Sequence, residues 1–156
     1  MKFSELISKS AIVKELKASD KKEAIKEIVE VMKNSYKAEN LKVSNILDKL
    51  MKRERIGSTG IGSGVAVPHA KIEGLQAVLG ALGRSSAGID YDAVDGAPVQ
   101  LIFVLLTPKN NAELNLQTLQ LVARATKQPN FCKFLKEAKD GKEIISILTE
   151  FDEVLK

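Results

Sequence analysis

The middle of this chain carries short apolar segments rich in β-branched residues, and segments with helical periodicity lie on both sides of them. Short apolar runs bounded by turn residues are typical of strands. They span residues 65–67, 77–82 and 99–106. The flanking segments place apolar residues three or four positions apart, as amphipathic helices do. No repeat and no linker rich in Pro, Gly or Ser divides the sequence. We therefore expect a single α/β domain over residues 1–156, in which helices cover both faces of a mixed β-sheet.

The helices before the predicted sheet have recognisable starts and ends. Asp20 begins a capping box, and the apolar residues after it predict a helix over residues 20–35. A second helix is expected from Ser44 until shortly before Gly57, with charged residues in its last turn. Helical periodicity returns beyond Pro108, where we expect two or three closing helices.

The interval between the last two predicted strands, Ser85 to Pro98, contains two glycines and three aspartates. These residues oppose a helical crossover, so we expect a hairpin-like, antiparallel connection there. The three aspartates are interpreted as turn formers, because they lack the Glu and Gly positions of an EF-hand calcium loop.

The counts of three rare residue types limit the chemistry that this chain can perform. It contains one Cys, one His and no Trp. A disulfide framework, a His/Cys zinc site and a haem-attachment motif each need more cysteines or histidines than that. Neither a metal nor a cofactor is expected.

Charge and hydropathy limit the possible partners and the location of the protein. Lys and Arg number 24 against 20 Asp and Glu, but Lys and Glu are interleaved along the same helices. Interleaving is typical of a solvated face and not of a nucleic-acid-binding stripe. The N-terminus lacks the apolar core of a signal peptide, and the longest apolar run, residues 99–107, falls short of the ~20 residues that cross a bilayer. We expect a cytoplasmic protein that neither binds nucleic acid nor inserts into a membrane.

One segment, residues 53–69, combines a cation, a glycine-rich loop and a nucleophile. Glycine tolerates the positive φ angles that turn backbone amides outward. The segment lacks the Lys and the preceding strand of a nucleotide-binding P-loop, and a dinucleotide-binding fingerprint also needs a strand before it. An anion-binding nest of backbone amides remains physically reasonable. Its candidate residues are Gly57, Ser58, Thr59, Gly60 and Gly62.

His69 is the sharpest candidate for a nucleophile. Pro68 fixes its own φ angle and holds Val67 extended, so the imidazole leaves the backbone on a stiff mount. A reference pKa of about 6.5 leaves much of an imidazole neutral near pH 7, with a free nitrogen lone pair. The alternative is a surface or structural histidine, but the glycine loop and Arg53 favour a functional role. A hydrolytic triad is disfavoured because no buried acid partner for this histidine can be identified.

Two motifs in this segment closely resemble a known family. GSTGIG at residues 57–62 and VAVPH at residues 65–69 are similar to the EIIA domains of the fructose/mannitol class of the bacterial phosphoenolpyruvate-dependent phosphotransferase system, especially the nitrogen-regulatory branch. The likeness continues, in family order, through residues 90–95, 98–108 and 116–124. It implies a three-layer α/β/α sandwich around a small mixed sheet. It also implies that His69 accepts a phosphoryl group and that Arg53 is the arginine beside it.

The sequence departs from the family at one position of the implied site. The family usually has a second histidine where this sequence has Asn115. An asparagine can donate an N–H to phosphate, but it cannot carry a positive charge or exchange protons. We expect the loss of one ionic hydrogen bond, which slows transfer by roughly ten- to a hundredfold without abolishing it.

The resemblance implies a phosphotransferase component with a phosphohistidine intermediate, not a stand-alone enzyme. We expect His69 to accept its phosphoryl group from an HPr-type phosphocarrier and the protein to act mainly as a regulator through its phosphorylation state. Regulation implies a partner such as a kinase or a transporter, and it is favoured because the sequence shows no IIB-like or membrane domain. Two alternatives stay open: a sugar-specific EIIA that passes phosphate to a separate IIB component, and a binding module that transfers nothing.

Overall fold

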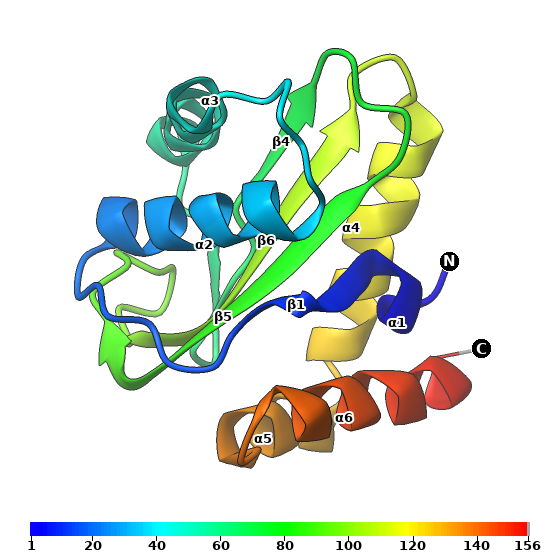
Figure 1. Cartoon of the computed structure of the whole chain (residues 1–156). Helices are drawn as coiled ribbons and strands as arrows, with labels where there is room; N and C mark the ends of the chain where they lie inside the picture. The colour runs from blue at the N-terminus through cyan, green and yellow to red at the C-terminus, as the bar shows by residue number, and fades with distance from the viewer. Residues whose placement is uncertain (156) are drawn as a thin grey trace.

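A computed structural model describes residues 1–155 as six helices around a six-stranded sheet (Figure 1). The helices are α1 (Phe3–Leu6), α2 (Lys21–Ser35), α3 (Val43–Ile56), α4 (Ala112–Thr126), α5 (Pro129–Glu137) and α6 (Gly141–Val154). The strands are β1 (Ile7–Val13), β2 (Gly60–Gly62), β3 (Val65–Ala66), β4 (His69–Ile72), β5 (Leu79–Ile89) and β6 (Val99–Pro108). Within these residues, no helix combines the length and the apolar character needed to cross a bilayer.

The predicted helices are confirmed within a residue or two. The side chain of Asp20 accepts a hydrogen bond from the Glu23 amide, which ends the chain's extended approach and starts α2 at Lys21. α3 begins at Val43, and three helices follow the sheet, as the periodicity predicted.

The sheet is mixed, as predicted, and β6 is its central strand. β5 and β6 form an antiparallel hairpin, while β3 and β4 pair with β6 in parallel. β1 extends the sheet beyond β5 in parallel, and β2 extends it beyond β3 in antiparallel orientation. The interval that the sequence assigned to a hairpin-like connection therefore joins two antiparallel strands.

Alternate side chains of β6 enter two separate cores. Leu101, Phe103 and Leu105 pack with α4, α5 and α6. Ile102, Val104 and Leu106 pack on the opposite face with α2 and α3. Both sets are almost completely buried because a strand covered on both faces has no side chain left for solvent. The three-layer α/β/α sandwich is confirmed, and Figure 1 shows α2 and α3 on the side of the sheet opposite α4.

The sheet differs from the prediction in three details. β5 runs to Ile89 instead of ending near residue 82, because pairing with β6 supports residues of low strand propensity. Strand β4 was not predicted, since it has only four residues and directly follows Pro68.

The third detail is strand β2, which lies inside the segment predicted to be entirely loop. A Cβ added at Gly60 would lie 2.7 Å from the Cβ of Ala93. Glycine at this position therefore permits close packing of a short strand, a role that glycine-rich composition alone does not distinguish from a loop.

Candidate functional site

His69 stands at the first position of β4, where the chain leaves Pro68. Its partner across the parallel pair with β6 is Leu105. Paired residues of adjacent strands point to the same face of a sheet, and Leu105 belongs to the core beneath α4. The imidazole is therefore half-buried on the face that α4 covers.

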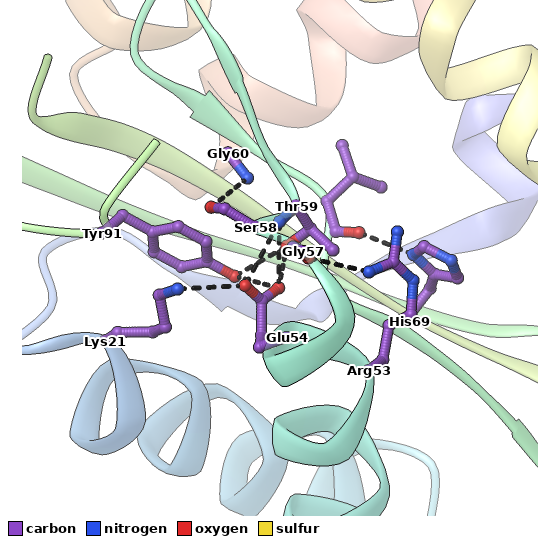
Figure 2. A network of polar contacts seen from close by, with 10 residues as sticks. Lys21, Arg53, Glu54, Gly57, Ser58, Thr59, Gly60, His69 and Tyr91 are labelled. Carbon is purple, nitrogen blue, oxygen red and sulfur yellow. Dashed lines mark hydrogen bonds and ion pairs between the residues drawn. The ribbon is translucent and has the colours of Figure 1, made fainter. Parts of the chain in front are cut away.

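The backbone of Val67 decides which imidazole nitrogen is available. Nδ1 of His69 lies 2.8 Å from the Val67 carbonyl oxygen (Figure 2). A carbonyl oxygen only accepts hydrogen bonds, so Nδ1 carries the hydrogen in this pair. In the neutral ring, Nε2 then holds the lone pair and is the nucleophilic atom.

The surroundings of His69 favour the neutral imidazole. Burial is the main cause that lowers its pKa below the ordinary value, and the Arg53 guanidinium lowers the pKa further. The hydrogen bond to Val67 acts in the opposite direction but does not overcome burial. The imidazole is therefore a free base near neutral pH.

One face of α4 closes a hollow over His69. The hollow has a volume of about 190 Å³. Leu119, Val122 and Ala123 line it, with a spacing that places all three on the same side of the helix. Arg53, Ser58, Thr59, Ile61 and Val67 complete the lining. The histidine thus sits between an apolar helix face and the glycine-rich segment.

A second, larger hollow of about 510 Å³ also borders His69, and the two hollows share His69 and Arg53. Its polar lining consists of the cationic residues Lys49, Lys52, Arg53 and Lys71, the imidazole and Asn115. None of the residues that line it carries a carboxylate. Such a set attracts an anion beside the imidazole.

Arg53 and His69 are brought together from different elements, since α3 supplies the arginine and β4 the histidine (Figure 2). Nη1 of Arg53 donates to the Gly57 carbonyl oxygen at 2.8 Å. This bond is made within one turn, at the end of α3, where helix carbonyls lack helical partners. It positions the guanidinium and leaves its other N–H groups for an anion.

Asn115 lies in the first turn of α4 and lines the larger hollow together with His69. Its Oδ1 accepts a hydrogen bond from the Thr107 hydroxyl at 2.8 Å. The structure therefore unites the three residues that the sequence selected, His69, Arg53 and Asn115, around one cation-lined hollow.

Two backbone amides of the predicted phosphate nest already have hydrogen-bond partners within the protein. The Thr59 amide donates to the Glu54 carboxylate, and the Gly60 amide donates to the Ser58 hydroxyl at 3.1 Å. Ser58 and Thr59 line the smaller hollow, but Gly57, Gly60 and Gly62 do not. Gly62 belongs to β2, where its φ of 102° matches the freedom expected of glycine.

A buried carboxylate beneath this segment was not recognised from the sequence. Glu54 accepts hydrogen bonds from the amide and hydroxyl of Thr59 and, at 3.0 Å, from the Tyr91 hydroxyl (Figure 2). Nζ of Lys21 lies 3.1 Å from the same carboxylate and 4.4 Å from the centre of the Tyr91 ring. Burial, as the largest cause, raises the pKa of Tyr91, so its hydroxyl keeps the proton that it donates.

A sequence signal for Glu54 did exist. Leu47 and Leu50 lie on the buried face of α3, and Glu54 follows Leu50 at the four-residue spacing of that face. A carboxylate on an apolar face needs donors from elsewhere in the fold, and the network supplies them. No such sequence pattern marks Thr107, the donor to Asn115.

Among residues 1–155, no group of three His, Cys, Asp or Glu side chains is placed to hold a metal ion.

Comparison with known proteins places these observations in a family. Residues 5–151 match the model for the phosphoenolpyruvate-dependent sugar phosphotransferase system, EIIA 2. A nitrogen regulatory protein of Bradyrhizobium diazoefficiens is 33% identical over 151 residues, which is 95% of each chain. A fructose-specific EIIA component of Haloferax volcanii is 36% identical over 104 residues, 67% of this chain and 68% of that one.

A solved structure gives the same answer for the fold. The crystal structure of nitrogen regulatory protein IIA-Ntr from Neisseria meningitidis matches with a TM-score of 0.84 and 32% identity, covering 93% of this chain and 97% of that one. The resemblance carried by residues 57–69 is thereby confirmed over almost the whole chain. This protein belongs to the EIIA 2 family of the phosphoenolpyruvate-dependent sugar phosphotransferase system.

Proposed function

We propose that this protein is a cytoplasmic phosphocarrier that accepts a phosphoryl group on Nε2 of His69 from an HPr-type donor and acts mainly as a regulator through its phosphorylation state. The observation that carries the proposal is the hydrogen bond from Nδ1 to the Val67 carbonyl oxygen, which leaves Nε2 nucleophilic inside a cation-lined hollow. The nitrogen regulatory proteins among its relatives support the regulatory role.

The transfer step exchanges one P–N bond for another. The Nε2 lone pair attacks phosphorus, the P–N bond of the donor's phosphohistidine breaks, and its electron pair returns to the donor imidazole. The phosphorylated ring of His69 keeps its hydrogen on Nδ1 and gains positive charge. The Val67 carbonyl oxygen stabilises that charge by accepting the N–H.

The transferred group carries close to two negative charges and needs donors that are already in place. Arg53 is fixed by Gly57, and Lys49, Lys52 and Lys71 line the same hollow. A charge-assisted hydrogen bond contributes about 1.5–3 kcal/mol. A few such bonds orient the group without preventing its departure to the next acceptor.

Exposed apolar side chains near the two hollows favour a protein as donor and acceptor. Ile56 lines the larger hollow and is 82% exposed, and Ile61 lines the smaller one and is 51% exposed. Leu116, next to Asn115, is 55% exposed. Apolar side chains that are exposed close together on a surface often mark a site of protein–protein contact. We assign this face to the HPr-type donor and to the regulated partner, a kinase or a transporter.

A second candidate function rests on the fructose-specific relative. If the phosphoryl group passes onward to a IIB component, the same site acts in sugar uptake. The chemistry on His69 is identical in the two cases, and only the acceptor differs.

The decisive experiment follows label from phosphoenolpyruvate through enzyme I and an HPr-type donor to this protein. We expect an acid-labile, alkali-stable phosphate that disappears in His69→Gln and persists in the control Lys26→Ala, whose exposed lysine lies on α2. Label that survives in His69→Gln would refute the assignment of the nucleophile.

Phosphoramidate, a small chemical phosphodonor, separates the site from its partner. Labelling of His69 by phosphoramidate without labelling through the HPr-type donor would refute the donor and retain the acceptor. No label from either source would leave only the third possibility, a binding module that transfers nothing. Adding a IIB component to the labelled protein then tests the sugar-transport alternative.

A further inference from the structure

We propose that Thr107 is a positioning residue, which fixes the Asn115 side chain so that its N–H groups, and not its oxygen, face a phosphoryl group on His69. The inference rests on the proposed function and adds a residue that neither the family motif nor the sequence indicated. It explains how an asparagine can act as a donor at the position where the resemblance led us to expect a second histidine.

Thr107 is oriented by the same strand register that orients His69. It lies two residues beyond Leu105 on β6 and therefore points to the same face of the sheet. α4 covers that face and presents Asn115 there, one turn before Leu119 in the lining of the smaller hollow. Thr107 is only 1% exposed, so its hydroxyl has no bulk water to bond.

The Thr107–Asn115 bond has one direction. Oδ1 of Asn115 can only accept, so the Thr107 hydroxyl donates across the 2.8 Å contact. The oxygen end of the amide is thereby engaged inside the protein. The two N–H groups on Nδ2 keep no partner among the hydrogen bonds of the described residues, and Asn115 lines the larger hollow together with His69 and Arg53.

Orientation matters here because an amide has two opposite ends. An asparagine free to turn over about its last torsion presents oxygen to a phosphoryl oxygen in one of two states, and two acceptors repel each other. A histidine in its charged form donates from both nitrogens and does not have this problem. In the structure the Thr107 hydroxyl donates to Oδ1, and while this bond is kept it leaves the N–H groups of Asn115 as the free end of the amide. A charged histidine donates from either end without such a bond.

The test compares labelling rates from phosphoenolpyruvate, through enzyme I and an HPr-type donor, in four variants of the full chain. Thr107→Val keeps the shape and removes the hydroxyl, and it should slow labelling roughly three- to tenfold, the effect of one hydrogen bond. Thr107→Ser keeps the hydroxyl and should label like the wild type. Asn115→Ala should be slow, and the double variant Thr107→Val/Asn115→Ala should be no slower than Asn115→Ala alone.

A second readout observes the amide itself. In ¹⁵N-labelled protein, the Asn115 side-chain N–H₂ signals should shift when His69 is phosphorylated, and Thr107→Val should reduce that shift. A merely structural role for Thr107 would lower the melting temperature without moving these signals, and this result would overturn the proposal.

Three further results would also overturn it: wild-type labelling by Thr107→Val, Thr107→Ser as slow as Thr107→Val, or additive losses in the double variant. Failure of the inference is distinct from failure of the proposed function. If Asn115→Ala labels at the wild-type rate while His69→Gln takes no label, the phosphocarrier stands and the positioning role falls.

Discussion

Arg53 and Glu54 are neighbours at the end of α3, yet they belong to two regions with opposite properties. Glu54 is 7% exposed and its carboxylate is surrounded by Thr59, Tyr91 and Lys21. Arg53 faces two open hollows, shares them with His69 and has one hydrogen bond, to the Gly57 carbonyl oxygen. In the region around Glu54, the polar groups bind one another. In the region around Arg53, hydrogen-bond donors line a hollow that can bind an anion.

The difference shows how the chain divides stability from chemistry. A buried carboxylate is tolerated only where its hydrogen bonds are complete, so the Glu54 network holds the segment from residue 57 to 60 in one conformation. An anion site needs the reverse, because donors already satisfied within the protein have nothing left for a phosphoryl group. Adjacent residues can serve both needs since successive helix positions point about 100° apart.

The largest expected effect is on the closed region. Glu54→Ala leaves Lys21, Thr59 and Tyr91 without their common partner and should lower the free energy of unfolding by roughly 3 kcal/mol. Tyr91→Phe removes one donor only and should cost about 1 kcal/mol. Urea denaturation measures both. A Glu54→Ala protein as stable as the wild type would show that the network does not hold the loop.

Arg53→Ala should separate the two regions most sharply. It removes a charge-assisted donor from the anion site, so labelling of His69 should slow by roughly ten- to a hundredfold. Its effect on unfolding should stay below about 1 kcal/mol, because the side chain makes one exposed hydrogen bond. Arg55→Ala is the matched control, since Arg55 is exposed on the same turn and lines neither hollow. Equal losses in both variants would mean that general positive charge, and not Arg53, assists transfer.

Asn115→His restores a residue that can carry charge on the open side. Labelling from the HPr-type donor should become faster by about tenfold, one ionic hydrogen bond being worth at least that factor. Rapid-quench measurement of the first turnover gives the rate. An unchanged rate would show that a neutral donor at residue 115 is sufficient. Of the residues tested in the anion site, only Arg53 would then assist transfer by its charge.

The smallest effect concerns the protonation of His69. Burial and Arg53 lower its pKa, so the NMR titration midpoint of this protein's single histidine should lie below the reference value of 6.5. Protonation of a group with a lowered pKa opposes folding, so stability should decline as the pH falls through and below 6.5. Arg53→Gln removes a nearby cation and should raise the midpoint. A wild-type midpoint above 6.5 would mean that burial is not the dominant influence.

Much of the fold followed from local patterns. The capping box at Asp20, the period of the helices and the apolar run that became β6 each depend on residues close together in sequence. β4 and the far half of β5 escaped prediction because the pairing with β6 supports them, and their own composition does not. β2 escaped because the close approach of Ala93 to Gly60 joins residues far apart in the chain.

The candidate site divides in the same way. The sequence could indicate His69, Arg53 and Asn115 as candidate site residues, because few types of side chain can accept or bind a phosphoryl group. The predicted amide nest remains a prediction, because composition alone does not show that the Glu54 carboxylate and the Ser58 hydroxyl already bind two of its amides. Those two acceptors belong to the same short segment, but only the folded backbone shows which amide each one meets.

By itself the sequence determined the α/β class, the family and the residue types that bring chemistry to the site. These depend on periodicity and on motifs whose members are near neighbours. Tertiary structure alone decided that Nε2 of His69 is the free nitrogen, that Glu54 is buried and that Thr107 engages the oxygen of Asn115. The physical reason is that a hydrogen bond depends on the direction of two groups, and the folded backbone sets that direction both for near neighbours such as His69 and Val67 and for distant residues such as Glu54 and Tyr91.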